Sequence, residues 1–267
     1  MSFELRNAPS TFQRFINEVL FGLEFVFPYL DDILVASENE EQHKTHLKLV
    51  FDRLQKHGLR VNISKLTLGV THLEFLGYLI TPEGSKPLPE KVDAILSCKL
   101  PETIRDLRTF LGLMNFYRRY LKNAAKHRAI LHEYSKGSKK NDKTKILWTE
   151  EAKKYFEKCK QDIANATLLS FPDPDLQMAL FTDASHFAIG SVVQQFEAGS
   201  WNPISFFSKK LTDAQKIYST YGRELLGIYL SVKNFKHLLG EQSFVIYTDH
   251  KPIAYAFHQK NERASPK

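Results

Sequence analysis

Cysteine is scarce in this chain of 267 residues, which contains only Cys98 and Cys159. Two cysteines cannot build a disulfide framework or a four-thiolate zinc site, and such scarcity is typical of a reducing compartment. No apolar run approaches the ~18 residues that cross a bilayer, and the first residues lack the basic and apolar regions of a signal peptide. The sequence therefore argues against a membrane-spanning, a secreted or a structural-zinc protein.

Acidic charge is in large deficit in only one part of the chain. Residues 1–80 carry 8 basic and 10 acidic groups, residues 81–165 carry 19 and 11, and residues 166–267 carry 10 and 9. The middle segment thus holds the whole excess of the net charge of +7. A basic segment of this kind suits a surface that follows a phosphate backbone, and a merely solvated helical face is the alternative.

The composition is that of a folded protein, and the length favours at least two compact units. In the first unit, apolar spacing predicts a helix over residues 40–57 and short strands at 61–63 and 73–80. Residues 81–165 predict stacked short helices, interrupted by an exposed basic loop at 136–145.

The last part of the chain predicts a sheet with one crossing helix. Three apolar runs within residues 176–207 predict a β-meander. A capping-box pattern at Thr212 predicts a helix that runs to about Leu239, and residues 244–249 predict a further strand. Such a crossover places the last strand beside the first one, in parallel.

Two of these strands end alike, in Thr-Asp at Asp183 and at Asp249. Parallel neighbours bring both carboxylates to the same edge of the sheet, where open α/β sheets build their sites. Glu224 lies on the intervening helix beside its apolar face, where an acid is costly unless a cation meets it. Three converging carboxylates are typical of a Mg²⁺ site. The alternative is that the aspartates are turn formers and Glu224 is a solvated helix residue.

A second acidic site is predicted at Asp31 and Asp32. Apolar runs of strand length flank this pair within residues 25–36, which predicts a hairpin with both acids at its tip. Adjacent acids repel each other, and a bound cation relieves that repulsion. Acids are also common in ordinary turns, so the pair alone is a weak signal.

Nine stretches of the chain, taken in order, match a known family. Tyr29-Leu30-Asp31-Asp32 and the apolar residues after it resemble the catalytic hairpin of reverse transcriptases. Residues 3–13 resemble the segment upstream of that hairpin, residues 62–65 the palm lysine motif, and residues 75–78 the primer grip. The stretches 107–113 and 116–120 resemble the thumb. The attached ribonuclease H domain is resembled by residues 182–185, 218–226 and 248–252. In this order they resemble the Pol polyprotein of gypsy-type LTR retrotransposons, a reverse transcriptase with attached ribonuclease H.

The resemblance implies roles for thirteen residues. It makes Asp31 and Asp32 palm metal ligands and Lys65 an acid for the leaving pyrophosphate. It makes Asp183, Glu224 and Asp249 the catalytic metal ligands of the ribonuclease H domain. The residues that it implies in nucleotide or template binding are Phe3, Arg6, Gln13 and Tyr29, and those in the primer grip are Leu76, Gly77 and Tyr78.

The resemblance implies a multi-domain α+β fold: a partial reverse-transcriptase palm over 1–80, a helical thumb and tether over 81–165, and an incomplete ribonuclease H-like α/β domain over 166–267. It also implies two-metal phosphoryl transfer with two Mg²⁺ ions in each active site, or Mn²⁺ in their place. The implied partners are an RNA template, a DNA primer, an RNA·DNA hybrid and deoxynucleoside triphosphates, with no membrane. The implied location is a cytoplasmic virus-like particle, with nuclear access as a further option.

The family's first palm aspartate lies upstream of Phe3, and its fourth ribonuclease H carboxylate lies beyond Lys267. We therefore expect impaired activity from the isolated chain. The alternative function is that of a catalytically inactive remnant that binds nucleic acid.

Overall fold

A computed structural model describes residues 6–122, 124–139, 141–240 and 242–258. The chain forms two compact units, Met1–Pro82 and Glu83–Lys267, and each is described by itself. In the described part of the chain, no helix combines the length and the apolar character needed to span a bilayer. The expected division of the second unit at residue 165 stays a prediction.

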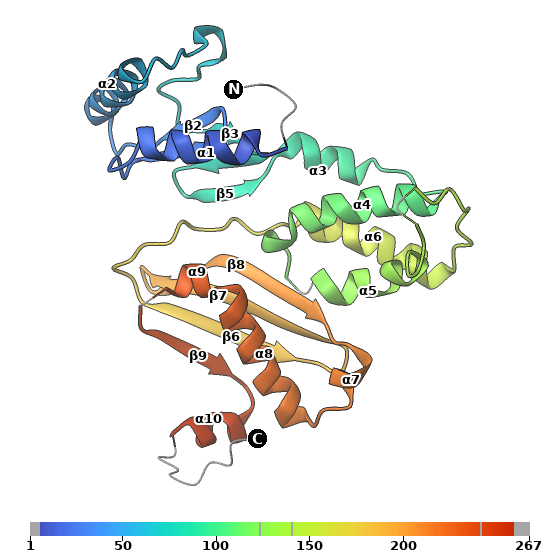
Figure 1. Cartoon of the computed structure of the whole chain (residues 1–267). Helices are drawn as coiled ribbons and strands as arrows, with labels where there is room; N and C mark the ends of the chain where they lie inside the picture. The colour runs from blue at the N-terminus through green and yellow to red at the C-terminus, as the bar shows by residue number, and fades with distance from the viewer. Residues whose placement is uncertain (1–5, 123, 140, 241, 259–267) are drawn as a thin grey trace. The chain divides into compact units, whose positions relative to one another are not determined.

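The first unit combines two hairpins with two α-helices (Figure 1). One hairpin pairs β1 with β2 and the other pairs β3 with β4, both antiparallel. The elements in chain order are α1 (Ala8–Val19), β1 (Val26–Tyr29), β2 (Asp32–Val35), α2 (Glu40–Lys56), the 3₁₀ turn η1 (Ile63–Lys65), β3 (Leu73–Phe75) and β4 (Tyr78–Thr81). The predicted helix over 40–57 and the strands within 73–80 are confirmed.

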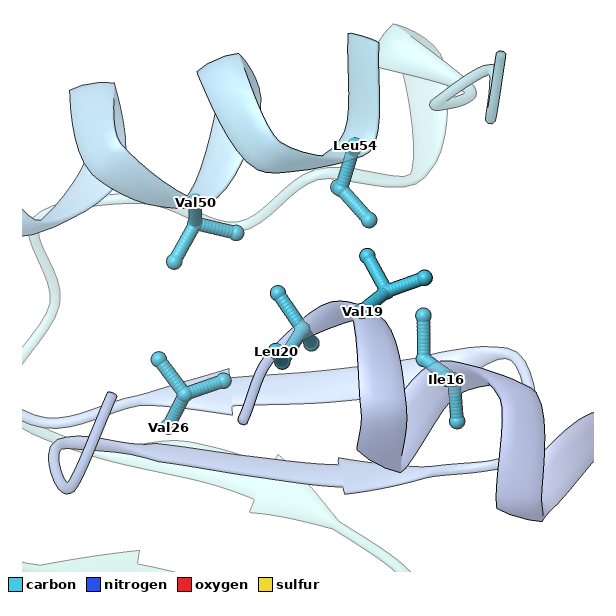
Figure 2. Close-up of a cluster of buried hydrophobic side chains, with 6 residues drawn as sticks. All are labelled: Ile16, Val19, Leu20, Val26, Val50 and Leu54. Atoms are coloured by element: carbon cyan, nitrogen blue, oxygen red, sulfur yellow. The ribbon is translucent and has the colours of Figure 1, made fainter. Parts of the chain in front are cut away.

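The core of the first unit lies between its two helices and the first hairpin. Figure 2 shows side chains from α1 and α2 pointing toward one another above β1. With Leu20, which follows α1, and Val26 of β1, they form a cluster whose members are all at least nine-tenths buried: Ile16, Val19, Leu20, Val26, Val50 and Leu54. This small core fixes the end of α1 and the hairpin in one body, and thereby places the acidic pair.

The strand predicted at residues 61–63 is wrong. Ile63 begins η1 instead, and its side chain is 82% exposed. The carboxamide oxygen of Asn62 accepts hydrogen bonds from the backbone N–H and the hydroxyl of Ser64, at 3.1 and 2.8 Å. This local side-chain capture competes with strand pairing, and alternation of apolar residues does not reveal it.

The second unit begins with a short strand and continues as helices. These elements are β5 (Gly84–Pro87), α3 (Pro89–Leu96), α4 (Ile104–Phe116), the 3₁₀ turn η2 (Arg118–Tyr120), α5 (Ala124–Tyr134) and α6 (Glu150–Ala164). The stacked short helices are confirmed, and β5 was not predicted. Ser85 in β5 exchanges two backbone hydrogen bonds with Leu169, at 2.8 and 3.0 Å, which ties the start of this unit to the segment before its large sheet.

That sheet has four strands in the order β8-β7-β6-β9. Its strands are β6 (Met178–Ala184), β7 (Ala188–Glu197), β8 (Ser200–Lys210) and β9 (Phe244–Thr248). The first three form the predicted antiparallel meander, and β9 pairs with β6 in parallel as predicted. Figure 1 shows α8 (Thr220–Asn234) lying across one face of the sheet.

The single helix predicted from Thr212 to about Leu239 is wrong. The capping box at Thr212 is present, but it opens a helix of only four residues, α7 (Asp213–Lys216). Ser219 caps a new helix, α8, and a third one, α9 (Lys236–Leu239), follows before α10 (Lys251–His258). The break places the N-terminus of α8 at the edge of the sheet where β6 and β9 end.

Candidate metal centre and acidic hairpin

Three carboxylates converge at one edge of the large sheet. Asp183 is the penultimate residue of β6, and Asp249 follows the last residue of β9. The parallel register pairs Thr182 with Thr248, so the next residue of each strand emerges at the same edge. With Glu224 from α8, ligand oxygens of the three carboxylates all lie within 4.8 Å of one another. The structure thus brings together all three residues that the sequence predicted for this site.

Glu224 comes to this edge because α8 buries one stripe of residues against the sheet. The stripe consists of residues three and four apart, namely Glu224, Gly227, Ile228 and Ser231. Gly227 faces the sheet: a Cβ at this position would lie 3.5 Å from the side chain of Ile189, an ordinary contact distance. One turn before it, Glu224 is only 4% exposed, so the alternative of a solvated helix residue is wrong.

Glu224 is buried beside two other carboxylates, and no ion pair among the described residues joins it to a cation. Its Oε1 accepts a hydrogen bond from the Ala184 N–H at 3.2 Å, whereas its buried Oε2 has no partner within the described residues. Burial raises the pKa of the Glu224 carboxyl, and the charges of Asp183 and Asp249 add to this rise; the Ala184 hydrogen bond and the charge of His250 oppose it. A divalent cation among the three carboxylates would satisfy Oε2 and remove the repulsion, so these residues fit a metal ion.

Two residues beside the triad were not predicted. Arg223 donates hydrogen bonds to the carbonyls of Lys216 and Tyr218, at 3.4 and 2.8 Å, and so closes the corner between α7 and α8. His250 packs its ring edge-on against Tyr221, with 5.8 Å between centroids. His250 could have been found from its place next to Asp249, but nothing in the sequence shows that Arg223 binds backward to the preceding helix.

The acidic pair of the first unit lies on the hairpin of β1 and β2, one position away from the predicted arrangement. Tyr29 pairs with Asp32, so the two-residue turn is Leu30-Asp31 and Asp32 already belongs to β2. Leu30 has φ +50, a left-handed conformation that costs free energy in a residue other than glycine. Both aspartates are exposed, and within the described residues no third acidic, histidine or cysteine side chain joins them in a ligand cluster.

Gln13 holds this turn from α1. Its amide oxygen accepts a hydrogen bond from the Leu30 N–H at 2.7 Å, and its amide nitrogen donates to the Pro28 carbonyl at 3.0 Å. The side chain therefore satisfies the N–H of the strained Leu30 and the carbonyl of Pro28 before it. The predicted contact of Gln13 with a nucleotide or template stays a prediction, as does that of the half-exposed Tyr29 on β1.

The other predicted residues of the first unit lie at its surface or at a turn. Arg6 and Lys65 are exposed, and no ion pair in the described residues joins Lys65 to either aspartate. Leu76 and Gly77 form the turn between β3 and β4, with φ +50 and +84, and Tyr78 begins β4. Phe3 lies outside the described residues. The roles predicted for these residues stay predictions.

Comparison with protein-family models matches residues 1–80 to reverse transcriptase (RNA-dependent DNA polymerase). Residues 148–246 match the RNase H-like domain found in reverse transcriptase. The first match lies in the unit with the acidic hairpin, and the second lies in the unit with the carboxylate triad.

Curated relatives match nearly the whole chain. It is 35% identical to the retrovirus-related Pol polyprotein from transposon opus of Drosophila melanogaster, covering 100% of this chain and 28% of the relative. It is 36% identical to that from transposon 297 of the same organism, covering 99% and 24%. It is 32% identical to the transposon Tf2-3 polyprotein of Schizosaccharomyces pombe, covering 95% and 19%. The chain thus spans between about a fifth and somewhat more than a quarter of these relatives.

Solved structures show the same fold. The foamy viral protease-reverse transcriptase in complex with dsDNA superposes with a TM-score of 0.82 at 22% identity, covering 99% of this chain and 55% of that one. The same enzyme in complex with RNA/DNA hybrid superposes with a TM-score of 0.81 at 23% identity, covering 92% and 33%. The resemblance inferred from the motifs is therefore confirmed: the chain belongs to the Pol polyproteins of gypsy-type LTR retrotransposons, and it spans their reverse transcriptase and RNase H-like segment.

Proposed function

We propose that this chain is the part of an RNA-directed DNA polymerase that carries its ribonuclease H centre, and that Asp183, Glu224 and Asp249 catalyse hydrolysis of RNA in an RNA·DNA hybrid. One observation carries the proposal: three carboxylates meet within 4.8 Å, and one of their oxygens is buried without a partner among the described residues. A buried acid with no cation is unfavourable for the fold alone, so its placement supports a role in binding.

The chain's own residues would fix the geometry of this reaction. Asp183 and Asp249 would bind two Mg²⁺ ions, or Mn²⁺, from the strand ends, and Glu224 would bind from the helix. When bound, two such ions supply a nucleophilic water and stabilise the leaving oxygen of a phosphodiester. The Ala184 N–H holds Glu224 in place at 3.2 Å, and Arg223 fixes the corner that leads into α8.

The polymerase half of the proposal concerns the first unit. In this unit, Asp31 and Asp32 would bind Mg²⁺ together with a deoxynucleoside triphosphate at the hairpin, and the unit would act on an RNA template and a DNA primer. The match of residues 1–80 to reverse transcriptase and the exposure of both aspartates support this. Lys65 would protonate the leaving pyrophosphate. We also propose that the protein acts in cytoplasmic virus-like particles, with access to the nucleus.

A labelled RNA·DNA hybrid tests the ribonuclease half. The expected result is cleavage of the RNA strand in Mg²⁺ but not in EDTA, and a loss of at least a hundredfold in Asp183→Asn. Asp175→Asn is the matched control, because Asp175 is exposed and lies before β6. Equal rates for the parent and Asp183→Asn would refute the proposal. Hybrid binding without cleavage would identify a protein that binds nucleic acid and catalyses nothing.

A further inference from the structure

Two side-chain hydrogen bonds join α8 to the large sheet, and no third one is present among the described residues. One is the bond that the Ala184 N–H donates to Glu224. The other lies two helical turns further along, where the hydroxyl of Ser231 donates to the hydroxyl oxygen of Ser191 on β7 at 2.7 Å. Both bonds reach the face of the sheet that α8 covers in Figure 1.

Both hydroxyls are buried next to the apolar core of this unit. Ser231 is fully buried, and Ser191 is 9% exposed. Val193 follows Ser191 on the same face of β7, Phe235 follows Ser231 one helical turn later, and both belong to that core. A buried hydroxyl costs free energy unless it is hydrogen-bonded, and these two satisfy each other. Two small apolar residues would fill the same place without this constraint, so what the hydroxyls add is a fixed geometry.

Ser191 lies in the row of the sheet that leads into the two aspartates of the metal centre. Thr182 pairs with Ser191 on one side and with Thr248 on the other. Asp183 and Asp249 are the next residues after these two threonines. A hydrogen bond from α8 to this row therefore places the helix relative to the same strands that position the two aspartates.

The other contacts of α8 define its position on the sheet less sharply. Gly227, between the two bonds, has no side chain that could interlock with the strands, and a Cβ there would lie at an ordinary contact distance of 3.5 Å from Ile189. Apolar packing is non-directional, so it tolerates small shifts of a helix. The cap at Ser219 and the guanidinium of Arg223 hold the first turn alone. The bond of Ser231 is thus the directional contact of the later turns.

We propose that Ser231 and Ser191 are positioning residues for the metal centre: their hydrogen bond fixes the height and the rotation of α8 on the sheet, and thereby the place of the Glu224 carboxylate. Neither serine touches the reacting atoms. They act through about two turns of helix, or ~10.5 Å of its axis, which behave as one rigid element. The inference rests on the proposed function in taking the triad as the metal site.

Alanine variants separate positioning from stability. Ser231→Ala leaves the Ser191 hydroxyl buried without its partner and should lower the Tm by roughly 2–10 °C. Ser231→Ala/Ser191→Ala removes both hydroxyls and should recover most of this loss, because no polar atom is then left unpaired. If the pair only stabilises the fold, every other property should recover together with the Tm.

The position of Glu224 should not recover in the double variant. In EDTA, the Ala184 amide, whose acceptor is Glu224, should exchange its hydrogen at least about threefold faster than in the parent, as measured by NMR. The Mg²⁺ binding that Asp183→Asn abolishes in titration calorimetry should weaken about 3- to 10-fold. In hybrid cleavage, kcat should fall about tenfold while the KM for the hybrid stays unchanged, because the serines lie away from the substrate.

The matched control removes another buried pair of hydroxyls from the same unit. Tyr120 donates to the hydroxyl oxygen of Ser85 at 3.1 Å, and neither residue belongs to α8 or to the large sheet. Ser85→Ala/Tyr120→Phe should change the Tm but neither the exchange of the Ala184 amide nor the affinity for Mg²⁺. The inference is overturned if Ala184 exchange in Ser231→Ala/Ser191→Ala equals that of the parent, or if the control accelerates it equally.

The proposed function can fail separately from this inference. A parent that neither binds Mg²⁺ at the triad nor cleaves the hybrid would refute the ribonuclease, whereas Ala184 exchange in EDTA would still decide whether the two serines position Glu224. A parent that cleaves, with a double variant that matches it in kcat and in Ala184 exchange, would refute the role of the serines alone.

Discussion

Glu224→Gln is expected to stabilise the protein in the absence of metal and to abolish its stabilisation by Mg²⁺. The substitution keeps the shape of the side chain and the acceptor for the Ala184 N–H, while it removes a charge that is buried within 4.8 Å of two other carboxylates. A buried polar atom without a partner costs about 1–3 kcal/mol, and the new amide N–H can donate to Asp183 or Asp249. We therefore expect the free energy of unfolding in EDTA to rise by about that amount, and the Tm to rise by about 2–4 °C per kcal/mol for a unit of this size.

Magnesium narrows or reverses this difference in stability between the two proteins. A ligand at 100 times its Kd stabilises the native state by about 2.7 kcal/mol, and only the parent has the full carboxylate set. Thermal unfolding with and without Mg²⁺ measures both effects, with Glu102→Gln as the control because Glu102 is exposed. If the Glu224→Gln variant melts below the parent in EDTA, or gains as much from Mg²⁺ as the parent does, this account of the site is refuted.

The pH dependence of the same variant has a defined sign. Because burial raises the pKa of the Glu224 carboxyl, the native state binds this proton more readily than the unfolded state does. The stability of the parent in EDTA should therefore fall as pH rises from the ordinary carboxyl range through the raised native pKa. Glu224→Gln removes this contribution, so the gain in stability over the parent should grow with pH and then level off.

Three further predictions concern packing and reactivity. Gly84→Ala should destabilise the second unit by more than about 2 kcal/mol in chemical denaturation, because a Cβ would lie 2.2 Å from the backbone oxygen of Leu169. The control Gly112→Ala has open space around the new Cβ and should be neutral or stabilising. Gln13→Leu should cost the first unit about 1–3 kcal/mol by leaving two backbone groups of the acidic hairpin unpaired, and unchanged unfolding would contradict the role given to this amide. Cys159 is fully buried, and burial raises the pKa of its thiol to about 12. A thiol reagent should therefore modify only Cys98 in the native protein and both cysteines after denaturation. Rapid modification of two thiols in the native protein would refute this prediction.

The sequence was a good guide wherever one pattern governs an element. The strand ends at Asp183 and Asp249 could be predicted because an apolar run and a Thr-Asp end repeat, and a crossover between two strands of one sheet places them in parallel. Glu224 followed from its place in a helical stripe. These three residues are far apart in the chain, yet each sits at a position that a local pattern of the sequence indicates.

The sequence failed where side chains bind backbone outside their own element. Arg223 and Ser219 end one helix and begin another where apolar spacing continues without interruption. Asn62 turns an apolar alternation into a 3₁₀ turn. The register of the acidic hairpin shifted by one because Gln13 supports a left-handed residue at Leu30, which no pattern within the hairpin reveals.

The two acidic centres differ in what holds them together. Asp31 and Asp32 are neighbours in the chain, so a single turn and one amide from α1 determine where they lie, and both stay in solvent. The triad depends instead on the parallel pairing of β6 with β9 and on the packing of α8 against β6 and β7. This packing carries Glu224 out of solvent and leaves one of its oxygens unpaired among the described residues. Glu224 is buried whereas Asp183 and Asp249 are exposed, so desolvation acts on Glu224 and makes the repulsion that its charge feels stronger than it would be at an exposed turn. The same fold that brings the triad together therefore gives it the greater need for a bound cation.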